Sequence, residues 1–453
     1  MAALARNETT PGLLATSGGT ALETLTRLWL LQAPVPLAAA EAALPDLVDR
    51  LCAEGILERS VSEVAARVDV RPYGDGDEDL WIVADLTPGL DGGPQRVRPD
   101  YVLGISPAAT SLAEQAVRRP AARALDLGTG CGVQALHLAA HCEEIVATDV
   151  NARALRLTRL NAALNGKDGI DVRDGSFFAP VAGERFDLIV TNPPFVISPA
   201  TGERLVYRDS GLPGDRAVED IVRQAREHLT DGGLCQVLAN WVILRDQPWE
   251  ERLAGWCEGV DAWVVQRERV DLPTYVEMWL KDAGHHPGTG EITQSDYQRR
   301  YSTWLTWLEE QGVEGIGFGW INLRRTDAEP VVRCEEWPYE VAQPIGIEIG
   351  EYFDRVEWLR QHPDLDGEHL VRRTDVIQET SGPPGAEDPA AVILRQQVGL
   401  RRARQVSTAE AAFVGACDGD LSLGQLSEAV AQIVGAGIEP GIIRELVAEG
   451  FLT

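Results

Sequence analysis

Apolar and polar positions follow two different periods along the middle of the chain. Short apolar runs with the length of buried strands occur at Leu125–Gly128, Ile145–Thr148, Ile170–Arg173, Phe186–Thr191 and Leu234–Leu238. Between these runs, apolar residues recur at helical spacing over Val133–Ala140, Ala152–Leu164 and Ala217–Leu229. This alternation of strands and helices, which extends over residues 122–325, predicts an α/β fold with a parallel, doubly wound sheet.

Helical spacing dominates both ends of the chain. Near the start, helices within Ala21–Arg59 precede two predicted strands, Val64–Val70 and Leu80–Leu86, and this order predicts a winged-helix-like unit. The stretches Leu51–Leu57 and Leu446–Leu452 share the pattern L-x-A-E-G-hydrophobic-L, which is either an internal repeat or a common way for a helix to end. We expect three domains: an N-terminal winged-helix-like domain (1–100), the α/β domain (101–330) and a C-terminal α+β extension that ends in a winged-helix-like helical unit (331–453).

The size and charge of the chain narrow the classes of partner. Its 453 residues exceed what one hydrophobic core usually organises, and its formal charge of −29 disfavours broad binding to phosphate backbones. No apolar run approaches the roughly 20 residues that cross a bilayer, so we expect no membrane partner. The seven cysteines are scattered without a CxxC pair, and no secretory signal pattern is evident. These features predict a cytoplasmic protein.

A glycine-rich turn follows the first predicted strand of the sheet. Gly128, Gly130 and Gly132 let the backbone pass close to a ligand, and Thr129 stands within the turn. The spacing is G-x-G-x-G, which differs from the G-x-G-x-x-G of dinucleotide sites. Asp126 lies just before the turn, where a carboxylate would repel a pyrophosphate but suits the amino group of a methionine moiety.

A second acid, Asp149, ends the next predicted strand. A carboxylate at that place can accept two hydrogen bonds from a ribose diol, and Val150 beside it belongs to the same predicted cofactor site. The alternative is that Asp149 caps the helix predicted at Ala152–Leu164. We favour the ribose role because the glycine turn and the acid are more specific together than either is alone.

These motifs resemble those of class I S-adenosylmethionine-dependent methyltransferases. The first motif of that family is similar to Leu125–Gly132, and its ribose-binding acid matches Asp149. The resemblance implies a Rossmann-like methyltransferase sheet with S-adenosylmethionine as the cofactor. It also implies that the loop after the third strand holds the adenine, where Asp174, Ser176 and Phe177 are the candidates and the choice between Asp174 and Ser176 is open.

The fourth predicted strand leads directly into Asn192-Pro193-Pro194-Phe195. The two prolines stiffen the turn and lack N–H donors, so nearby carbonyl oxygens and the Asn192 side chain can accept hydrogen bonds from an incoming –NH₂ group. The lone pair of that nitrogen then faces the sulfonium methyl, and Phe195 offers a flat face to a planar group. We therefore predict catalysis by positioning at Asn192, Pro193, Pro194 and Phe195, with Asn192 also at the cofactor.

The N-P-P-[F/Y] signature resembles the amino-methylating branch of the family, which includes HemK-type glutamine methyltransferases, RsmC-type rRNA guanine-N2 methyltransferases and adenine-N6 DNA methyltransferases. The similarity runs from Gly104 to Leu244 and includes Tyr207–Arg216. Phe195 is typical of the guanine enzymes, whereas the acidic charge favours a protein or small molecule. The resemblance implies methylation of a planar nitrogen, with a protein glutamine amide favoured over the alternatives of an rRNA base (guanine N2 or adenine N6) and a small molecule.

Other residues carry weaker hypotheses. His137 and His141 have metal-ligand spacing next to Cys142, but further ligands are not evident, so we predict no metal site. The pair His285-His286 lies in a Gly/Pro loop, where solvated side chains are expected. Ten of the twelve tryptophans lie between Trp241 and Trp358, and we expect most of them in the core, with one or two at a substrate cleft as the alternative.

Basic residues are few enough to limit nucleic-acid binding. An RNA-binding patch would have to use the short basic runs, in which we expect isolated surface charges: Arg299-Arg300, Arg324-Arg325, Arg372-Arg373 and Arg401-Arg402-Arg404. A winged-helix regulator that only senses the cofactor is a further alternative. It is disfavoured because Leu37–Glu58 holds one arginine and several acids.

Overall fold

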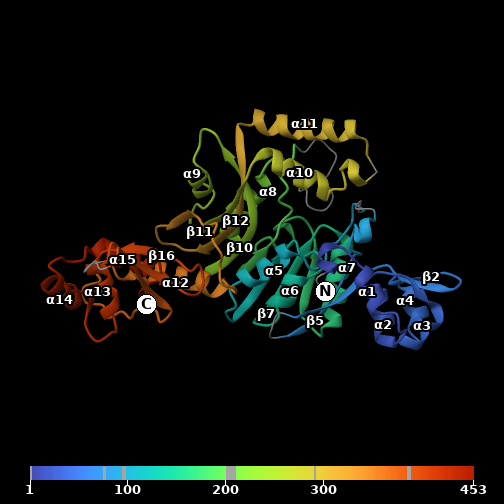
Figure 1. Cartoon of the computed structure of the whole chain (residues 1–453), viewed down its shortest axis with the longest axis horizontal. Helices are drawn as coiled ribbons and strands as arrows, with labels where there is room; N and C mark the ends of the chain where they lie inside the picture. The colour runs from blue at the N-terminus through green and yellow to red at the C-terminus, as the bar shows by residue number, and fades with distance from the viewer. Residues whose placement is uncertain (1–2, 75–77, 94–97, 200–210, 290–291, 385–388) are drawn as a thin grey trace. The chain divides into compact units, whose positions relative to one another are not determined.

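The computed structural model describes residues 3–74, 78–93, 98–199, 211–289, 292–384 and 389–453. The chain divides into two compact units, which are residues 1–113 with 119–337, and residues 114–118 with 338–453. The first unit holds the N-terminal helices and the large sheet, which Figure 1 colours from blue to yellow. The division into three domains stays a prediction.

The start of the first unit has the element order of a winged helix. Its elements are η1 (Leu4–Arg6), α1 (Thr10–Ala15), α2 (Ala21–Leu25), η2 (Thr26–Leu30), β1 (Val35–Pro36), α3 (Leu37–Ala43), α4 (Val48–Ala53), β2 (Leu57–Arg59), β3 (Glu63–Ala66), β4 (Asp69–Gly74), β5 (Asp79–Ala84) and η3 (Leu90–Gly92). Strands β1, β3 and β2 form one small antiparallel sheet. Helices α3 and α4 precede the β2–β3 wing.

The predicted pair of strands is found as an antiparallel hairpin, but its first strand lies further along the chain than predicted: β4 (Asp69–Gly74) pairs with β5 (Asp79–Ala84). Residues 64–70 do not form one strand, because β3 ends at Ala66, where it pairs with β2. The β2–β3 hairpin, in which the Ser60 N–H donates to the Glu63 carbonyl, was not predicted. A tight turn of serine and glutamate does not have the glycine that usually signals a hairpin, so the sequence pattern missed it.

Eight strands form the main sheet in the order β13-β11-β12-β10-β9-β6-β7-β8. Its elements are α5 (Pro107–Gln115), β6 (Ala121–Leu127), α6 (Val133–Leu138), β7 (Cys142–Asp149), α7 (Ala152–Leu164), β8 (Ile170–Asp174), η4 (Ala179–Val181), β9 (Phe186–Thr191), α8 (Arg216–Ala225), η6 (Arg226–His228), β10 (Leu229–Leu244), α9 (Trp249–Ala254), β11 (Val260–Val270), α10 (Leu272–Asp282), η7 (Pro287–Thr289), α11 (Gln294–Glu310), β12 (Val313–Arg325) and β13 (Val332–Glu336). The predicted α/β doubly wound fold is confirmed.

The prediction that this sheet is parallel holds for only part of it. Strands β6 to β10 pair in parallel, but β12 lies antiparallel between β10 and β11. The chain leaves β11, forms α10 and α11, and returns as β12 beside β11, so it reverses direction instead of making a crossover (Figure 1). Apolar runs reveal strands but not their direction, which explains the error.

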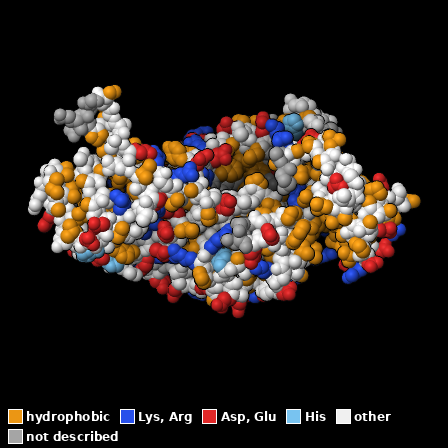
Figure 2. All heavy atoms as spheres, turned by 60° about the horizontal axis from the view of Figure 1, so that its bottom comes forward, with side chains coloured by type: hydrophobic (Ala, Val, Ile, Leu, Met, Phe, Trp, Pro, Cys, Tyr) orange, Lys and Arg blue, Asp and Glu red, His pale blue; other side chains and the backbone are white. Residues whose placement is uncertain are grey.

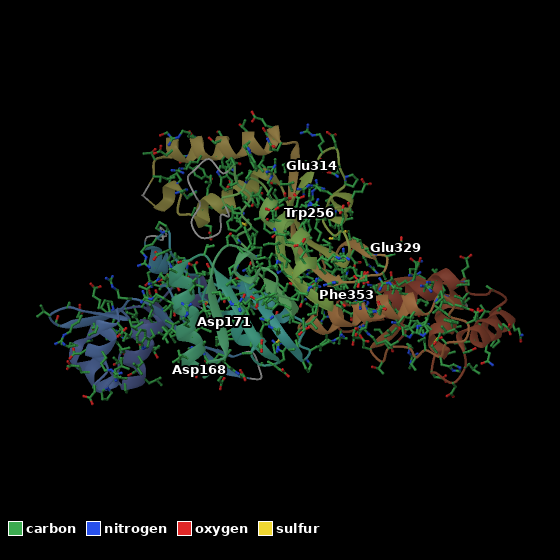
Figure 3. The ribbon with its side chains drawn as sticks, turned by 180° about the vertical axis from the view of Figure 1, so that it is seen from behind. Asp168, Asp171, Trp256, Glu314, Glu329 and Phe353 are labelled. Atoms are coloured by element: carbon green, nitrogen blue, oxygen red, sulfur yellow. The ribbon has the colours of Figure 1, made fainter. Side chains whose placement is uncertain are left out.

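Tryptophans fill the interior around the antiparallel strands. The indole of Trp241 is fully buried over β12, where a Cβ on Gly317 would lie 2.5 Å from its Nε1 and one on Gly319 would lie 2.9 Å from its Cη2. The small residues at these alternate positions therefore make room for the ring. Trp256, which is labelled in Figure 3, is also buried, with the guanidinium of Arg252 4.7 Å from its ring centre. The expectation of mostly core tryptophans is confirmed.

The second unit combines a helix, a small sheet and a helical end. Its elements are α12 (Gly346–Gln361), β14 (Val376–Ser381), β15 (Ala391–Gln396), β16 (Ala403–Val406), α13 (Thr408–Ala416), α14 (Leu423–Val434) and α15 (Pro440–Ala448). Strands β14, β15 and β16 form an antiparallel sheet. The predicted α+β character of this region is therefore found in the structure.

The two stretches with the shared sequence pattern have the same helix ending. After α4, Ile56 N–H donates to the Leu51 carbonyl at 2.9 Å, and after α15, Phe451 N–H donates to the Leu446 carbonyl at 2.8 Å. The glycine between them has a φ of 71° at Gly55 and 76° at Gly450. Both are Schellman motifs, in which a left-handed glycine closes the helix. The internal repeat stays a hypothesis, because the two stretches share this geometry but many other helices also end in it.

Candidate functional site

A cavity of about 1350 Å³ lies in the first unit, at the carboxyl ends of the parallel strands. Most of the predicted site residues line it: Asp126, Gly128, Thr129, Gly130, Asp149, Val150, Ser176, Phe177, Asn192, Pro193, Pro194 and Phe195. Gly132 and Asp174 are not among the lining residues. Parallel strands that end at one edge of the sheet bring these distant segments together.

The glycine turn after β6 exposes bare backbone to this cavity. Gly128 and Gly130 have φ values of 79° and 58°, and an added Cβ at either would meet no atom within 4 Å. A side chain there would project into open space and fill the cradle. Gly132 has a φ of 87°, but a Cβ on it would lie 3.0 Å from Thr158 Cγ2, so this glycine serves the packing of α7 behind the turn.

Asp126 lies beneath the turn with a buried carboxyl group. Its Oδ2 accepts hydrogen bonds from Thr129 Oγ1 at 2.6 Å and from the Ala135 N–H at 3.0 Å. Burial raises the pKa of Asp126 to about 7 in spite of these two bonds, because only 1% of the residue is exposed. With a pKa of about 7, this carboxyl group can release its proton near neutral pH and then pair with an ammonium group that enters the cavity.

Asp149 ties two neighbouring turns together at the end of β7. Its Oδ2 accepts from the Gly130 N–H at 3.0 Å and its Oδ1 from the Asn151 N–H at 2.8 Å. Burial raises the pKa of Asp149 above its usual value, and the negative charge of Asp174 adds to the shift. The helix-cap alternative was wrong, because the N-cap of α7 is Asn151, whose side chain accepts from the Arg153 N–H at 2.9 Å.

The loop after β8 brings two of its three candidates to the cavity. Ser176 and Phe177 are lining residues, and the Phe177 ring also packs against the main hydrophobic core. Asp174 is exposed at the last position of β8, where it pairs in register with Asp149. Of the two alternatives that the sequence left open, the geometry favours Ser176 as the polar neighbour of a bound ring.

The turn after β9 carries an unsatisfied acceptor. Thr191 Oγ1 donates to the Leu127 carbonyl at 2.7 Å, which holds this turn next to the glycine turn. Within the part of the chain that the structure describes, the buried Oδ1 of Asn192 has no hydrogen-bond partner. Such a buried oxygen costs free energy unless a ligand supplies a donor. Phe195 follows half-buried, with its ring 6.1 Å from that of Trp279 and inclined at 68°.

Helix α10 contributes a wall of the cavity that the motifs did not predict. Met278, Trp279 and Ala283 line the cavity, together with His285 just beyond the helix and Phe318 from β12. The only signal in the sequence was the high tryptophan content of this region. Solvation of His285 was expected, but the residue is half-buried at the cavity.

Several other predictions concern residues near the site. His137 is buried and bonds with Tyr73 Oη at 2.9 Å, and the described residues hold no group of His, Cys, Asp and Glu placed to bind a metal ion. Residues 207–210 of the predicted Tyr207–Arg216 motif lie outside the described residues. None of the helices in the described ranges is long and apolar enough to span a membrane.

Comparisons with known proteins agree with the geometry of the site. Residues 104–260 match the family model described as methyltransferase small domain, and residues 1–67 match a domain of unknown function, DUF7059. The chain is 34% identical over 162 residues to the release factor glutamine methyltransferase of Xylella fastidiosa, which covers 32% of this chain and 54% of that one. These matches confirm the resemblance to class I methyltransferases of the amino-methylating branch.

Two further relatives represent different acceptors. The ribosomal protein uL3 glutamine methyltransferase of Bradyrhizobium diazoefficiens is 34% identical over 152 residues, 31% of this chain and 48% of that one. The ribosomal RNA small subunit methyltransferase C of Salmonella arizonae is 36% identical over 120 residues, 26% of this chain and 31% of that one. The chain thus spans between about a third and about half of the curated relatives it matches, and the match leaves its acceptor unassigned.

Proposed function

We propose that this chain is an S-adenosylmethionine-dependent N-methyltransferase that methylates a planar nitrogen, with a protein glutamine amide as the acceptor. One observation carries the proposal: Asn192 lines the same cavity as the bare glycine turn and Asp149, and its buried Oδ1 has no partner among the described residues. An amide –NH₂ supplies the donor that this oxygen lacks.

The residues present fit the cofactor. Gly128 and Gly130 leave a cradle that a Cβ would fill, Asp126 suits its ammonium group, and Asp149 suits a ribose diol. When bound, S-adenosylmethionine supplies an electrophilic methyl group on a sulfonium. The task of Asn192 is then to hold the acceptor nitrogen by its hydrogens, and that of Phe195 is to keep the planar group oriented, so positioning replaces a strong base.

The charge of the cavity supports a protein acceptor over RNA. Among the lining residues that the structure describes, Arg153 is the only arginine or lysine, and its guanidinium binds Asp85, with Nε 2.9 Å from Oδ1. The short basic runs that an RNA-binding patch would have to use also contain paired arginines: Arg324 bonds to Asp261 at 3.1 Å, and Arg404 to Glu445 at 2.6 Å. On the face drawn in Figure 2, acidic and basic side chains are interspersed rather than separated.

A second candidate, an rRNA guanine, is favoured by one position. The ring after the two prolines is Phe195, which is typical of the guanine enzymes, and the Salmonella arizonae relative is named for ribosomal RNA. The acceptor can be decided by transfer of a radiolabelled methyl group from the cofactor to purified release factor, ribosomal protein uL3 and small-subunit rRNA. We expect protease-sensitive label that complete enzymatic digestion of the protein releases as N5-methylglutamine. Label that only ribonuclease removes would assign the activity to RNA.

Cofactor affinity should increase with pH through the titration of Asp126. Because burial raises the pKa of this carboxyl to about 7, it is mostly protonated at pH 6 and must release a proton before it pairs with an ammonium. For S-adenosylhomocysteine, affinity should rise about tenfold from pH 6 to pH 8, with a proton released on binding in calorimetry. Asp126→Asn should remove this dependence, and a flat wild-type profile would exclude the pairing.

A further inference from the structure

Helix α10 presents two aromatic side chains to the turn after β9. Tyr275 and Trp279 are four residues apart and therefore lie on the same face of the helix. Trp279 meets Phe195 edge to face, and their ring centres are 6.1 Å apart. The helix thus contacts the turn at the position where the acceptor would lie.

The hydroxyl of Tyr275 makes a direct bond to the same segment. The Ile197 N–H, two residues beyond Phe195, donates to Tyr275 Oη at 2.8 Å, and Asn240 Nδ2 donates to the same oxygen at 3.3 Å. Tyr275, Asn240 and Ile197 are all fully buried. A buried bond of this length fixes the position of the backbone that donates it.

The turn depends on such an external bond more than an ordinary turn does. Pro193 and Pro194 have no N–H, so the backbone of the turn offers fewer donors with which to fix itself. At one end, Thr191 Oγ1 binds the Leu127 carbonyl, and at the other end Ile197 binds Tyr275. Asn192 and Phe195 lie between these two attachment points, so their placement depends on both.

We propose that Tyr275 is a positioning residue for methyl transfer, which acts through the Ile197 N–H to hold Asn192 and Phe195 in their productive geometry. The proposal rests on the proposed function. Loss of the hydroxyl should leave the cofactor half of the cavity intact and displace the acceptor half. A shift of the order of 1 Å in such a group costs about 10²-fold in rate.

A role in core packing alone makes a different prediction. The Tyr275 ring packs against Phe318, 6.0 Å between centres, and against Trp279. Phenylalanine keeps that ring and removes only the oxygen. Tyr275→Phe should therefore be almost silent if packing is the whole role, and it should impair transfer if the bond to Ile197 matters.

The test uses two cofactor analogues so that it does not depend on knowing the acceptor. Sinefungin carries an amine in place of the S-methyl group, and its N–H groups would reach the acceptors assigned to the substrate nitrogen, whereas S-adenosylhomocysteine has no such group. Tyr275→Phe should leave the Kd of S-adenosylhomocysteine within about twofold and weaken sinefungin about tenfold, by loss of one oriented hydrogen bond. Tyr301→Phe, on neighbouring helix α11, is the matched control and should change neither.

The variants Asn192→Ala and Tyr275→Phe test the proposed function and the role of Tyr275 separately. If Asn192→Ala changes the ratio of the two affinities and Tyr275→Phe does not, the proposed function stands and the role of Tyr275 is wrong. If neither variant changes the ratio, the proposed function fails as well. With a protein acceptor, Tyr275→Phe should lower kcat about 10- to 100-fold and move KM less than threefold.

If Tyr275→Phe does not fold, a measurement on the wild-type protein still tests the proposal. Amide hydrogen exchange in the wild-type protein measures the bond directly, because a buried, bonded N–H exchanges slowly. We expect Ile197 to be protected to the same degree as the central strand β9. Rapid exchange at Ile197 would show that no such attachment exists in solution.

Discussion

Replacing Asn192 with alanine should lower turnover by about 10²- to 10³-fold or more, while the affinity for the cofactor stays within about threefold. The buried Oδ1 of Asn192 has no partner in the described residues, so its loss removes an acceptor that matters only when an –NH₂ group is present. An interaction made with the reacting group lowers kcat when it is lost, because it stabilises the transition state. Initial rates of labelled-methyl transfer and calorimetry with S-adenosylhomocysteine measure the two quantities.

A control variant separates this role from the general loss of a carboxamide. Asn165 also uses its side chain, which donates to the Trp81 carbonyl and accepts from the Trp81 N–H, each at 2.8 Å, but it is not among the cavity-lining residues. Asn165→Ala should lower the melting temperature and leave turnover at saturating cofactor unchanged. Wild-type turnover in Asn192→Ala would remove the proposed mechanism.

The sequence was most informative where the backbone itself requires particular residues. Gly128 and Gly130 occupy left-handed conformations, and Pro193 and Pro194 remove donors, so each motif revealed a local geometry before any fold was known. Apolar periods also located the strands, and β9 begins and ends where the pattern placed it, at residues 186–191. From these elements, the rule that parallel strands end at one edge brings Asp126, Asp149 and Asn192 together.

Features that depend on long-range packing could not be predicted in this way. Nothing in the apolar run of residues 313–325 reveals that β12 runs antiparallel between two earlier strands. The contribution of α10 to the cavity follows from that reversal, and so Trp279 and His285 were not identified as site residues. The β2–β3 hairpin, which turns at residues 60–63, was missed for a similar reason. The pairing of β3 with β2 defines this hairpin, and no glycine marks its turn.

Removal of the Asp149 carboxylate should weaken cofactor binding more than any other single change at the cofactor end. Asp149 lines the cavity, and its two oxygens, which accept from the Gly130 and Asn151 N–H groups, would also accept hydrogen bonds from a ribose diol. Hydrogen bonds to a charged group contribute about 1.5–3 kcal/mol each, so Asp149→Ala should raise the Kd of S-adenosylhomocysteine by at least about 10²-fold. Isothermal calorimetry at fixed pH measures this change directly.

Asp174 provides the matched control, because it is an acid of the same type at the same level of the neighbouring strand. It pairs in register with Asp149 but is exposed and absent from the cavity-lining residues. Asp174→Ala should leave the Kd within about threefold, or lower it slightly, since the negative charge that raises the pKa of Asp149 disappears. A larger loss of affinity in Asp174→Ala than in Asp149→Ala would show that the ribose binds at the end of β8 and that its assignment to Asp149 is wrong. Ser176 and Phe177 would then no longer be the residues next to the adenine, because the whole cofactor would lie one strand further along the sheet.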